Sequence, residues 1–153
     1  GWQFPVGLWY EDLAVIPAFC TLTDRIRLYP YKIYQYRQRE NSIMSKSNYS
    51  ERYLHIIPSC RNVYTLLHGK GYEDELEYLM LFQLCYYASF RFFAFDKFEE
   101  IHNCIDALEQ MYPHWQNNVY YRKRPFLFRF YCGLLKNGHF HLAKLLAHLK
   151  EQH

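Results

Sequence analysis

Apolar side chains recur at helical spacing through most of the last hundred residues, and this periodicity constrains the fold more than any other feature. The clearest run lies on one face of a predicted helix: Phe98, Ile101, Ile105, Leu108 and Tyr112. We expect Asp96 to cap this helix and Pro113 to end it. The same reasoning predicts four further helices, over 53–68, 73–92, 125–135 and 139–150. Five antiparallel helices of this length form a small bundle, so we expect a mainly α fold.

The composition is that of a globular chain in a reducing compartment. The chain has 153 residues, half of them hydrophobic, which is enough to bury a core. Its low glycine and proline content argues against a disordered or collagen-like chain. The net charge of +3 is too small to predict a nucleic-acid partner, and we expect none. Five scattered cysteines without a C-x-x-C pair favour buried thiols and a cytoplasmic location.

The first fifty residues have a different pattern, which predicts a short α/β segment. Ile16-Pro17 indicates a short helix with proline in its first turn. Polar and apolar residues then alternate over 25–29 and again over 32–38, which predicts two strands. A polar link follows and divides the chain into a segment 1–50 and a helical domain 51–153.

Two groups of polar residues in this segment could carry chemistry. Glu11 and Asp12 lie just ahead of the first predicted helix, where two carboxylates are most often solvated and favoured by the helix dipole. Alternatively, one of them is a general base, which needs a hydroxyl within hydrogen-bond reach. Arg37 and Arg39 share a face of the second predicted strand. Their planar guanidinium groups either bind a phosphate or form a charged strand edge that discourages aggregation.

In their order and spacing, these motifs resemble the end of the catalytic domain of family 2 glycosyltransferases, which have the GT-A fold. The resemblance covers about residues 4–44 and rests on an ordered series: Phe4-x-x-Gly7-x-x-Tyr10-Glu11-Asp12-Leu13, the helix with Ile16-Pro17, the strand 25–28 and Tyr34-x-Tyr36-Arg37-x-Arg39-x-x-Ser42-Ile43. It implies that the helix and two strands of segment 1–50 are the tail of a GT-A catalytic domain. Residues 51–153 would then be a helical C-terminal domain.

The resemblance implies an inverting transfer of a sugar from a nucleotide-sugar donor to a glycan acceptor, such as a cell-surface polysaccharide. Asp12 would be the catalytic base that deprotonates the acceptor hydroxyl, and Glu11 would help to shape the site. Arg37, Arg39 and Ser42 would lie near the donor diphosphate or the acceptor, with Arg39 the best match by position. In the parent enzyme a divalent metal, Mg or Mn, would assist the leaving group, with its ligands mostly outside this chain.

Two motifs of such enzymes do not occur in the 153 residues: the Asp-x-Asp that holds the metal and diphosphate, and the Gln-x-x-Arg-Trp of processive members. The resemblance therefore implies a C-terminal fragment that lacks the donor-binding half and is inactive alone. The alternative is a non-catalytic helical protein–protein interaction module, which the amphipathic helices and the incomplete site support. Formation of a homo-oligomer through sheet edges left by truncation is left open.

The stretch 122–130, three basic residues and a proline followed by an aromatic run, has two interpretations. It is either a charged helix start followed by a core stripe, or a segment that rests on an anionic membrane surface. The longest charge-free apolar stretch, 78–90, is too short to span a bilayer. The aromatic residues around it are more typical of bundle core than of a sugar-stacking platform: Tyr86, Tyr87, Phe90, Phe92, Phe93 and Phe95. We expect a cytoplasmic protein, with peripheral membrane contact left open.

Overall fold

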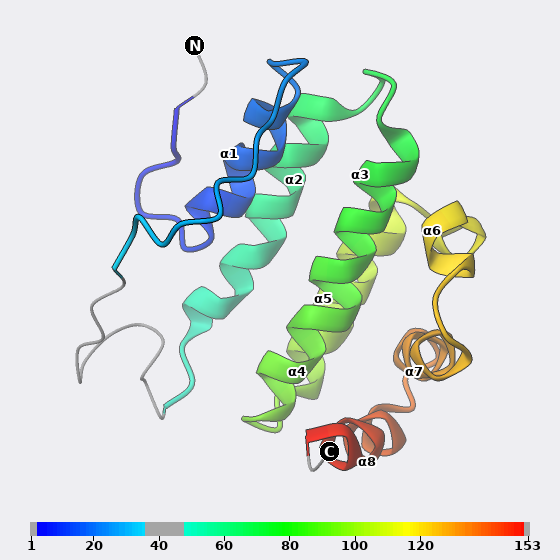
Figure 1. The fold of residues 1–153 in the computed structure, drawn as a ribbon. Coiled ribbons are helices and arrows are strands. Elements are labelled where there is room, and N and C mark those ends of the chain that lie inside the picture. The colour runs from blue at the N-terminus through cyan, green and yellow to red at the C-terminus, as the bar shows by residue number, and fades with distance from the viewer. Residues whose placement is uncertain (1–2, 36–47, 152–153) are drawn as a thin grey trace.

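The computed structural model describes residues 3–35 and 48–151 (Figure 1). Within these ranges the protein is a bundle of helices and forms no strand. In chain order the elements are α1 (Glu11–Cys20), η2 (Glu51–His55), α2 (Ile56–Leu67), α3 (Glu73–Met80), η3 (Leu81–Tyr87), α4 (Ala88–Phe93), α5 (Phe98–Met111), η4 (Trp115–Asn117), α6 (Val119–Arg122), α7 (Phe126–Lys136) and α8 (Phe140–Glu151). The predicted mainly α bundle is therefore confirmed.

The centre of the bundle is formed by α2, the continuous stretch α3–η3–α4, and α5 (Figure 1). On one side α1 packs along α2, and on the other side lie α6, α7 and α8. In this view α7 is seen almost end-on beside the upright α3–η3–α4 stretch, so the two elements cross. The central helices meet through fully buried side chains such as Val63, Leu84, Ile101 and Leu108. Because α1 contributes Ala18 to the same core, the N-terminal helix and the later helices share one hydrophobic interior.

Helix α5 follows the predicted spacing but not the predicted cap. Ile101, Ile105 and Leu108 are buried on its inner face, as their periodicity predicts. Asp96, however, does not cap the helix; it has a left-handed φ of 55°, and its carboxylate accepts a hydrogen bond from Lys144 on α8. Lys97 takes the cap position without a side-chain hydrogen bond. The capping prediction is wrong because the Asp96 side chain links the start of α5 to α8 instead.

The predicted helix over 73–92 is confirmed as α3–η3–α4, with one unexpected feature in its middle. Leu81–Tyr87 winds as a π-helix, a rare geometry that is often found at functional sites. The aromatic residues of this stretch divide between two environments. Phe92 and Phe93 are buried in the core, as predicted, whereas Tyr86 and Phe90 line a cavity beside α7.

The remaining predicted helices are confirmed with small shifts at their ends. Helix α2 stops just before Gly69 and Gly71, whose φ angles of 75° and 87° are natural for glycine. Helices α7 and α8 match the predicted ranges 125–135 and 139–150 to within about one residue. The short elements η4 and α6 were not predicted. Asn118 starts α6, where its side-chain oxygen accepts the N–H groups of Tyr120 and Tyr121.

Helix α1 is longer than expected and contains its proline rather than beginning at it. It starts at Glu11, so Pro17 lies in the interior of the helix. Proline has no N–H, and therefore the Leu13 carbonyl receives no helical hydrogen bond from that position. Ala14, Val15 and Ala18 form the buried face that packs on α2. Packing of this small-residue face against α2 compensates for the missing hydrogen bond.

The predicted strand over 25–29 is wrong, because this stretch has no regular secondary structure. The described part of the second predicted strand, 32–35, has none either, and its remainder lies outside the described residues. A strand needs partners for its backbone N–H and C=O groups, and residues 3–35 and 48–151 supply no neighbouring strand. The apolar side chains of the alternation accordingly point into solvent; Leu28 is 92% exposed. The α/β character of segment 1–50 is thus not supported, and the boundary at residue 50 stays a prediction.

The cysteine prediction is confirmed for four of the five thiols. Cys60, Cys85, Cys104 and Cys132 are buried and free, whereas Cys20, at the end of α1, is exposed. Burial raises the pKa of Cys60 to about 12, so this thiol stays protonated at neutral pH. In the part of the chain that the structure describes, every helix is too short or too polar to cross a membrane.

Candidate functional site

The candidate site is the turn into α1, which carries Glu11 and Asp12. Both carboxylates are exposed and occupy the first turn, where the helix dipole favours negative charge. Tyr10 precedes them in a left-handed conformation, with φ 62° and ψ 36°. Its carbonyl accepts the N–H of Ala14 at 3.0 Å, which closes the first turn. The tight turn therefore places both carboxylates on the outside of the helix start.

Three polar side chains of η2 and α2 hold this turn in place through its backbone. The Trp9 N–H donates to Nδ1 of His55 at 3.1 Å, and the Ser59 hydroxyl donates to the Trp9 carbonyl at 3.1 Å. One helical turn further on, the Asn62 amide donates to the Ala14 carbonyl at 2.8 Å. Spacings of four and three residues place these donors and acceptors on one face of the helix. We refer to His55, Ser59 and Asn62 as the α2 clamp.

The α2 clamp was not predicted from the sequence, although a signal for it exists. Three polar residues, His55, Ser59 and Asn62, recur at helical spacing beside the buried apolar face of α2. That apolar face is formed by Ile56, Cys60, Val63 and Leu67. A polar stripe of this kind is usually solvated, but Ser59 is fully buried. A buried hydroxyl requires a hydrogen-bond partner, and here the partner is the backbone ahead of Asp12.

The carboxylate of Asp12 is exposed and makes a local hydrogen bond. Its Oδ1 accepts the N–H of the next residue, Leu13, at 2.7 Å. Within residues 3–35 and 48–151 neither Asp12 nor Glu11 takes part in an ion pair. An exposed carboxylate on a fixed backbone can accept a proton from a bound hydroxyl, which is the geometric requirement for a general base.

Two arginines lie against aromatic rings at or next to this turn, and they were not predicted as site residues. The Arg52 guanidinium is 5.8 Å from the ring centre of Trp9, and that of Arg91 is 5.0 Å from the ring centre of Tyr53. Trp9 and Tyr53 meet edge to face with their centroids 5.6 Å apart. These cation–π contacts hold positive charge next to Trp9 and Tyr53.

Burial also affects the phenol of Tyr10, the residue just before the two carboxylates. It raises the pKa of Tyr10 to about 12, and the nearby Arg91 cation opposes part of that shift. Among residues 3–14, the acidic side chains are those of Glu11 and Asp12, and both are exposed to solvent.

The other predicted site residues, Arg37, Arg39 and Ser42, lie outside the described residues. Their proximity to Asp12 stays a prediction. Among the described residues no group of three or more His, Cys, Asp and Glu side chains could hold a metal ion. The described residues do not form a site for Mg or Mn, and we derive no step through a metal.

Compared with protein-family models, curated proteins and solved structures, the chain gives no match.

Proposed function

We propose that this chain is the C-terminal part of an inverting, GT-A-type glycosyltransferase, with Asp12 as its catalytic base. The observation that carries the proposal is the turn itself: the backbone around Asp12 is fixed by the α2 clamp, while its carboxylate is exposed and forms no ion pair with the described residues. A fixed backbone that carries a solvent-exposed carboxylate is what a positioned proton acceptor needs. The reaction class, inverting sugar transfer, is inferred from the resemblance of the ordered motifs in residues 4–44 to family 2 glycosyltransferases.

The proposed reaction has a simple proton and bond balance. Asp12 takes the proton of an acceptor hydroxyl, and the oxygen forms a bond to the anomeric carbon of the donor sugar. The bond from that carbon to the nucleoside diphosphate breaks on the opposite face, and the diphosphate leaves with the electron pair. Glu11 shapes the acceptor side of the site. Arg37, Arg39 and Ser42 are proposed to contact the diphosphate or the acceptor, where positive charge stabilises the leaving group.

A second observation supports the view that residues 22–35 belong to a larger domain. The described residues do not bury the alternating apolar side chains of this stretch: Leu22, Ile26, Leu28 and Ile33 are all exposed. Alternation of this kind is stable when one face of a strand is buried against a sheet. A donor-binding half would supply that sheet, together with the Asp-x-Asp motif that these 153 residues lack.

The test of the proposal is to determine the sequence encoded upstream of Gly1 in the source gene. We expect a βαβ half with an Asp-x-Asp motif, and no sugar transfer by the 153-residue chain alone. A reading frame that starts at Gly1 would remove the donor site and the proposal with it. Transfer by the isolated chain would overturn the inference that it is an inactive part.

The competing function is a non-catalytic helical interaction module. It is favoured by one specific feature, the exposed stripe of Leu142, Leu145 and Leu149 on α8. In such a module Glu11 and Asp12 are only the solvated first turn of α1. The two functions make opposite predictions for a substitution of Asp12. Sugar transfer by the whole protein is lost if Asp12 is the catalytic base, and is unaffected if Asp12 belongs to a solvated first turn.

A further inference from the structure

The C-terminal third of the chain is strongly basic, which the small net charge conceals. Residues 110–150 contain no Asp or Glu, while the other 112 residues hold eleven basic and fifteen acidic side chains. The net charge of +3 is thus made of +7 in this part and −4 in the rest. The seven cations are Arg122, Lys123, Arg124, Arg129, Lys136, Lys144 and Lys150. Charge segregation of this kind points to an anionic partner for the C-terminal part.

Some of these cations are compensated within the fold and others are not. Lys136 pairs with Glu109 at 2.7 Å, and Lys144 pairs with Asp96. By contrast, the exposed cations 122–124 and Arg129 form no ion pair with the described residues. Their contacts are to neutral groups: Arg122 donates to Asn117 at 2.6 Å, and the Arg124 guanidinium lies 4.7 Å from the ring centre of Phe128.

Exposed apolar side chains follow directly after these cations along α7. Phe126 is 72% exposed, and Leu127 and Phe130 are exposed as well. Phe126 and Phe130 are one helical turn apart and their rings stack, with centroids at 5.8 Å. The first turn of α7 therefore presents an aromatic surface to solvent beside four unpaired cations.

Helix α8 adds a second exposed apolar stripe. Leu142, Leu145 and Leu149 are spaced by three and four residues, so they share one face, and all three are about half exposed. The periodicity alone would assign this face to a bundle core, but the core is instead reached by Ala143 and Ala147. The result is a basic, amphipathic helix pair whose apolar faces no described part of the chain covers.

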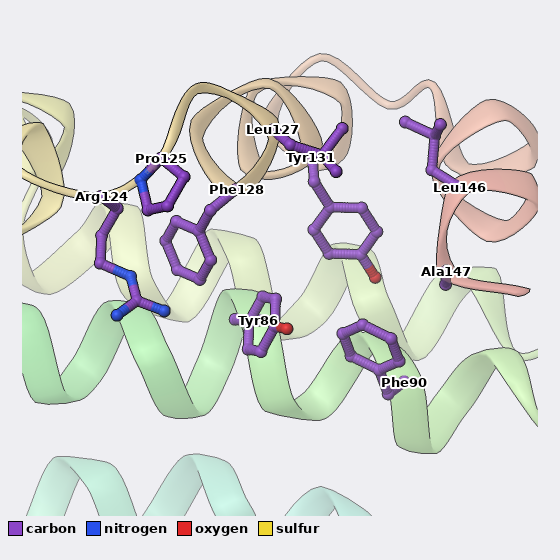
Figure 2. A pocket seen from close by; sticks show the side chains of 9 residues that line it. All are labelled: Tyr86, Phe90, Arg124, Pro125, Leu127, Phe128, Tyr131, Leu146 and Ala147. Atoms are coloured by element: carbon purple, nitrogen blue, oxygen red, sulfur yellow. The ribbon is translucent and has the colours of Figure 1, made fainter. Parts of the chain in front are cut away.

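A cavity of about 230 Å³ lies between these two helices and the central stretch (Figure 2). Tyr86 and Phe90 form its wall on the η3–α4 side, and Phe128 and Tyr131 project into it from α7. Leu146 closes it on the α8 side. The hydroxyls of Tyr131 and Ser89 form a hydrogen bond at 2.7 Å, so the Tyr131 hydroxyl has a partner without a polar ligand.

The ends of the cavity differ in chemistry. Figure 2 shows the Arg124 side chain at one end, next to Pro125 at the start of α7. Leu127 both lines the cavity and is exposed, so the apolar interior is continuous with the outer surface of α7. A hydrocarbon chain with an anionic head group matches an aromatic cavity that has a guanidinium at its end.

We propose that α7, α8 and the basic segment 122–124 form a docking surface for an anionic phospholipid bilayer, with the cavity as a place for one acyl chain. The cations 122–124 and Arg129 meet the lipid phosphates, and the exposed side chains of α7 and α8 enter the interfacial layer. A second copy packed through the same surface is less well matched, because residues 110–150 contain no acidic side chain to meet the cations of the other copy. The inference is independent of the proposed glycosyltransferase function.

The test is co-sedimentation of the full chain with vesicles of equimolar phosphatidylglycerol and phosphatidylcholine at low salt. The variant Arg122→Gln/Lys123→Gln/Arg124→Gln is compared with a control that removes the same charge elsewhere, Arg25→Gln/Arg27→Gln/Lys32→Gln. All six side chains are exposed, so neither variant disturbs the core. We expect the first variant to bind about 100-fold more weakly, since each of the three cations near an anionic surface contributes about fivefold. The control keeps most of the wild-type binding.

Three further measurements bear on the same surface. Leu142→Gln/Leu145→Gln/Leu149→Gln is expected to weaken binding to the same vesicles, and added salt is expected to weaken wild-type binding. Pure phosphatidylcholine vesicles are expected to bind poorly. Absence of binding to the anionic vesicles, equal losses in both charge variants, or a stable dimer that the α8 leucine variant dissociates would each overturn the proposal.

Discussion

The hydroxyl of Ser59 on α2 donates a hydrogen bond to the carbonyl of Trp9, 3.1 Å away and fifty residues earlier in the chain. This contact lies three residues before Asp12, and it joins the candidate catalytic turn to α2. Helix α2 therefore positions the backbone that carries the proposed base.

Removing the α2 clamp should loosen α1 from the bundle. Asn62→Ala deletes the 2.8 Å hydrogen bond to the Ala14 carbonyl, and Ser59→Ala deletes the one to Trp9. We expect each to lower the free energy of unfolding by about 1–2 kcal/mol, because a half-buried carbonyl loses its partner. Urea denaturation followed by circular dichroism measures this. Thr65→Ala is the control, since its exposed hydroxyl bonds only to the carbonyl of Arg61 on the same helix; an equal loss there would refute the role of the clamp.

Asn118 is expected to be one of the most sensitive polar positions. It is buried, caps α6 with its side-chain oxygen, and donates to the Asp74 carbonyl at 2.8 Å and to Glu77 at 2.9 Å. Asn118→Ala should destabilise the protein by about 2–4 kcal/mol, because a cap and two further hydrogen bonds are lost together. The adjacent, exposed Asn117→Ala should cost less than about 1 kcal/mol. If Asn118→Ala and Asn117→Ala lowered the melting temperature by similar amounts, the structural role of Asn118 would be contradicted.

Thiol reactivity should separate one cysteine from the other four. Cys20 is exposed at the end of α1, whereas Cys60, Cys85, Cys104 and Cys132 are buried. A thiol-disulfide reagent at pH 8 is expected to modify a single thiol of the folded protein quickly and the rest only after unfolding. Cys20→Ser should abolish the fast phase. A fast phase that survives this substitution would show that a buried thiol is open to solvent.

Stability should decline in alkaline solution. Burial raises the pKa of Cys60 from 9.0 to about 12 and that of Tyr10 from 10.0 to about 12. The folded state therefore keeps protons that the unfolded state releases above pH 9. The stabilisation is complete below pH 9 and is lost as pH rises toward 12. Unfolding free energies measured in urea between pH 8 and pH 11 test this, and a flat profile would contradict the burial of both groups.

The sequence predicted those elements that depend on local pattern and missed those that depend on distant partners. The run from Phe98 to Tyr112 gave α5 correctly, because its periodicity and the following Pro113 are local signals. The alternation over 25–29 could not form a strand, because pairing requires a second strand that the described residues do not contain. The leucine stripe of α8 looked like a core face but is exposed, since the alanines on another face of the helix pack inward.

The candidate site likewise combines a feature that the local sequence predicted with contacts to distant residues that it could not predict. The place of Glu11 and Asp12 at the start of a helix followed from their neighbours in the sequence. The hydrogen bonds from Ser59 and Asn62 could not be predicted, because they join segments about fifty residues apart. The π-helical turn Leu81–Tyr87 had no recognisable sequence signal either, and it places Tyr86 in the cavity beside α7.

The central claim, that Asp12 is a catalytic base, is tested most directly by assaying Asp12→Asn in the whole protein that the source gene encodes. Sugar transfer from the nucleotide-sugar donor would be compared with that of Asp24→Asn, an exposed aspartate twelve residues further on. We predict that kcat falls by about 10²–10⁴ in Asp12→Asn with little change in donor KM, while Asp24→Asn stays within about twofold of wild type. Full activity in Asp12→Asn would contradict the account and leave α1 with an ordinary solvated first turn.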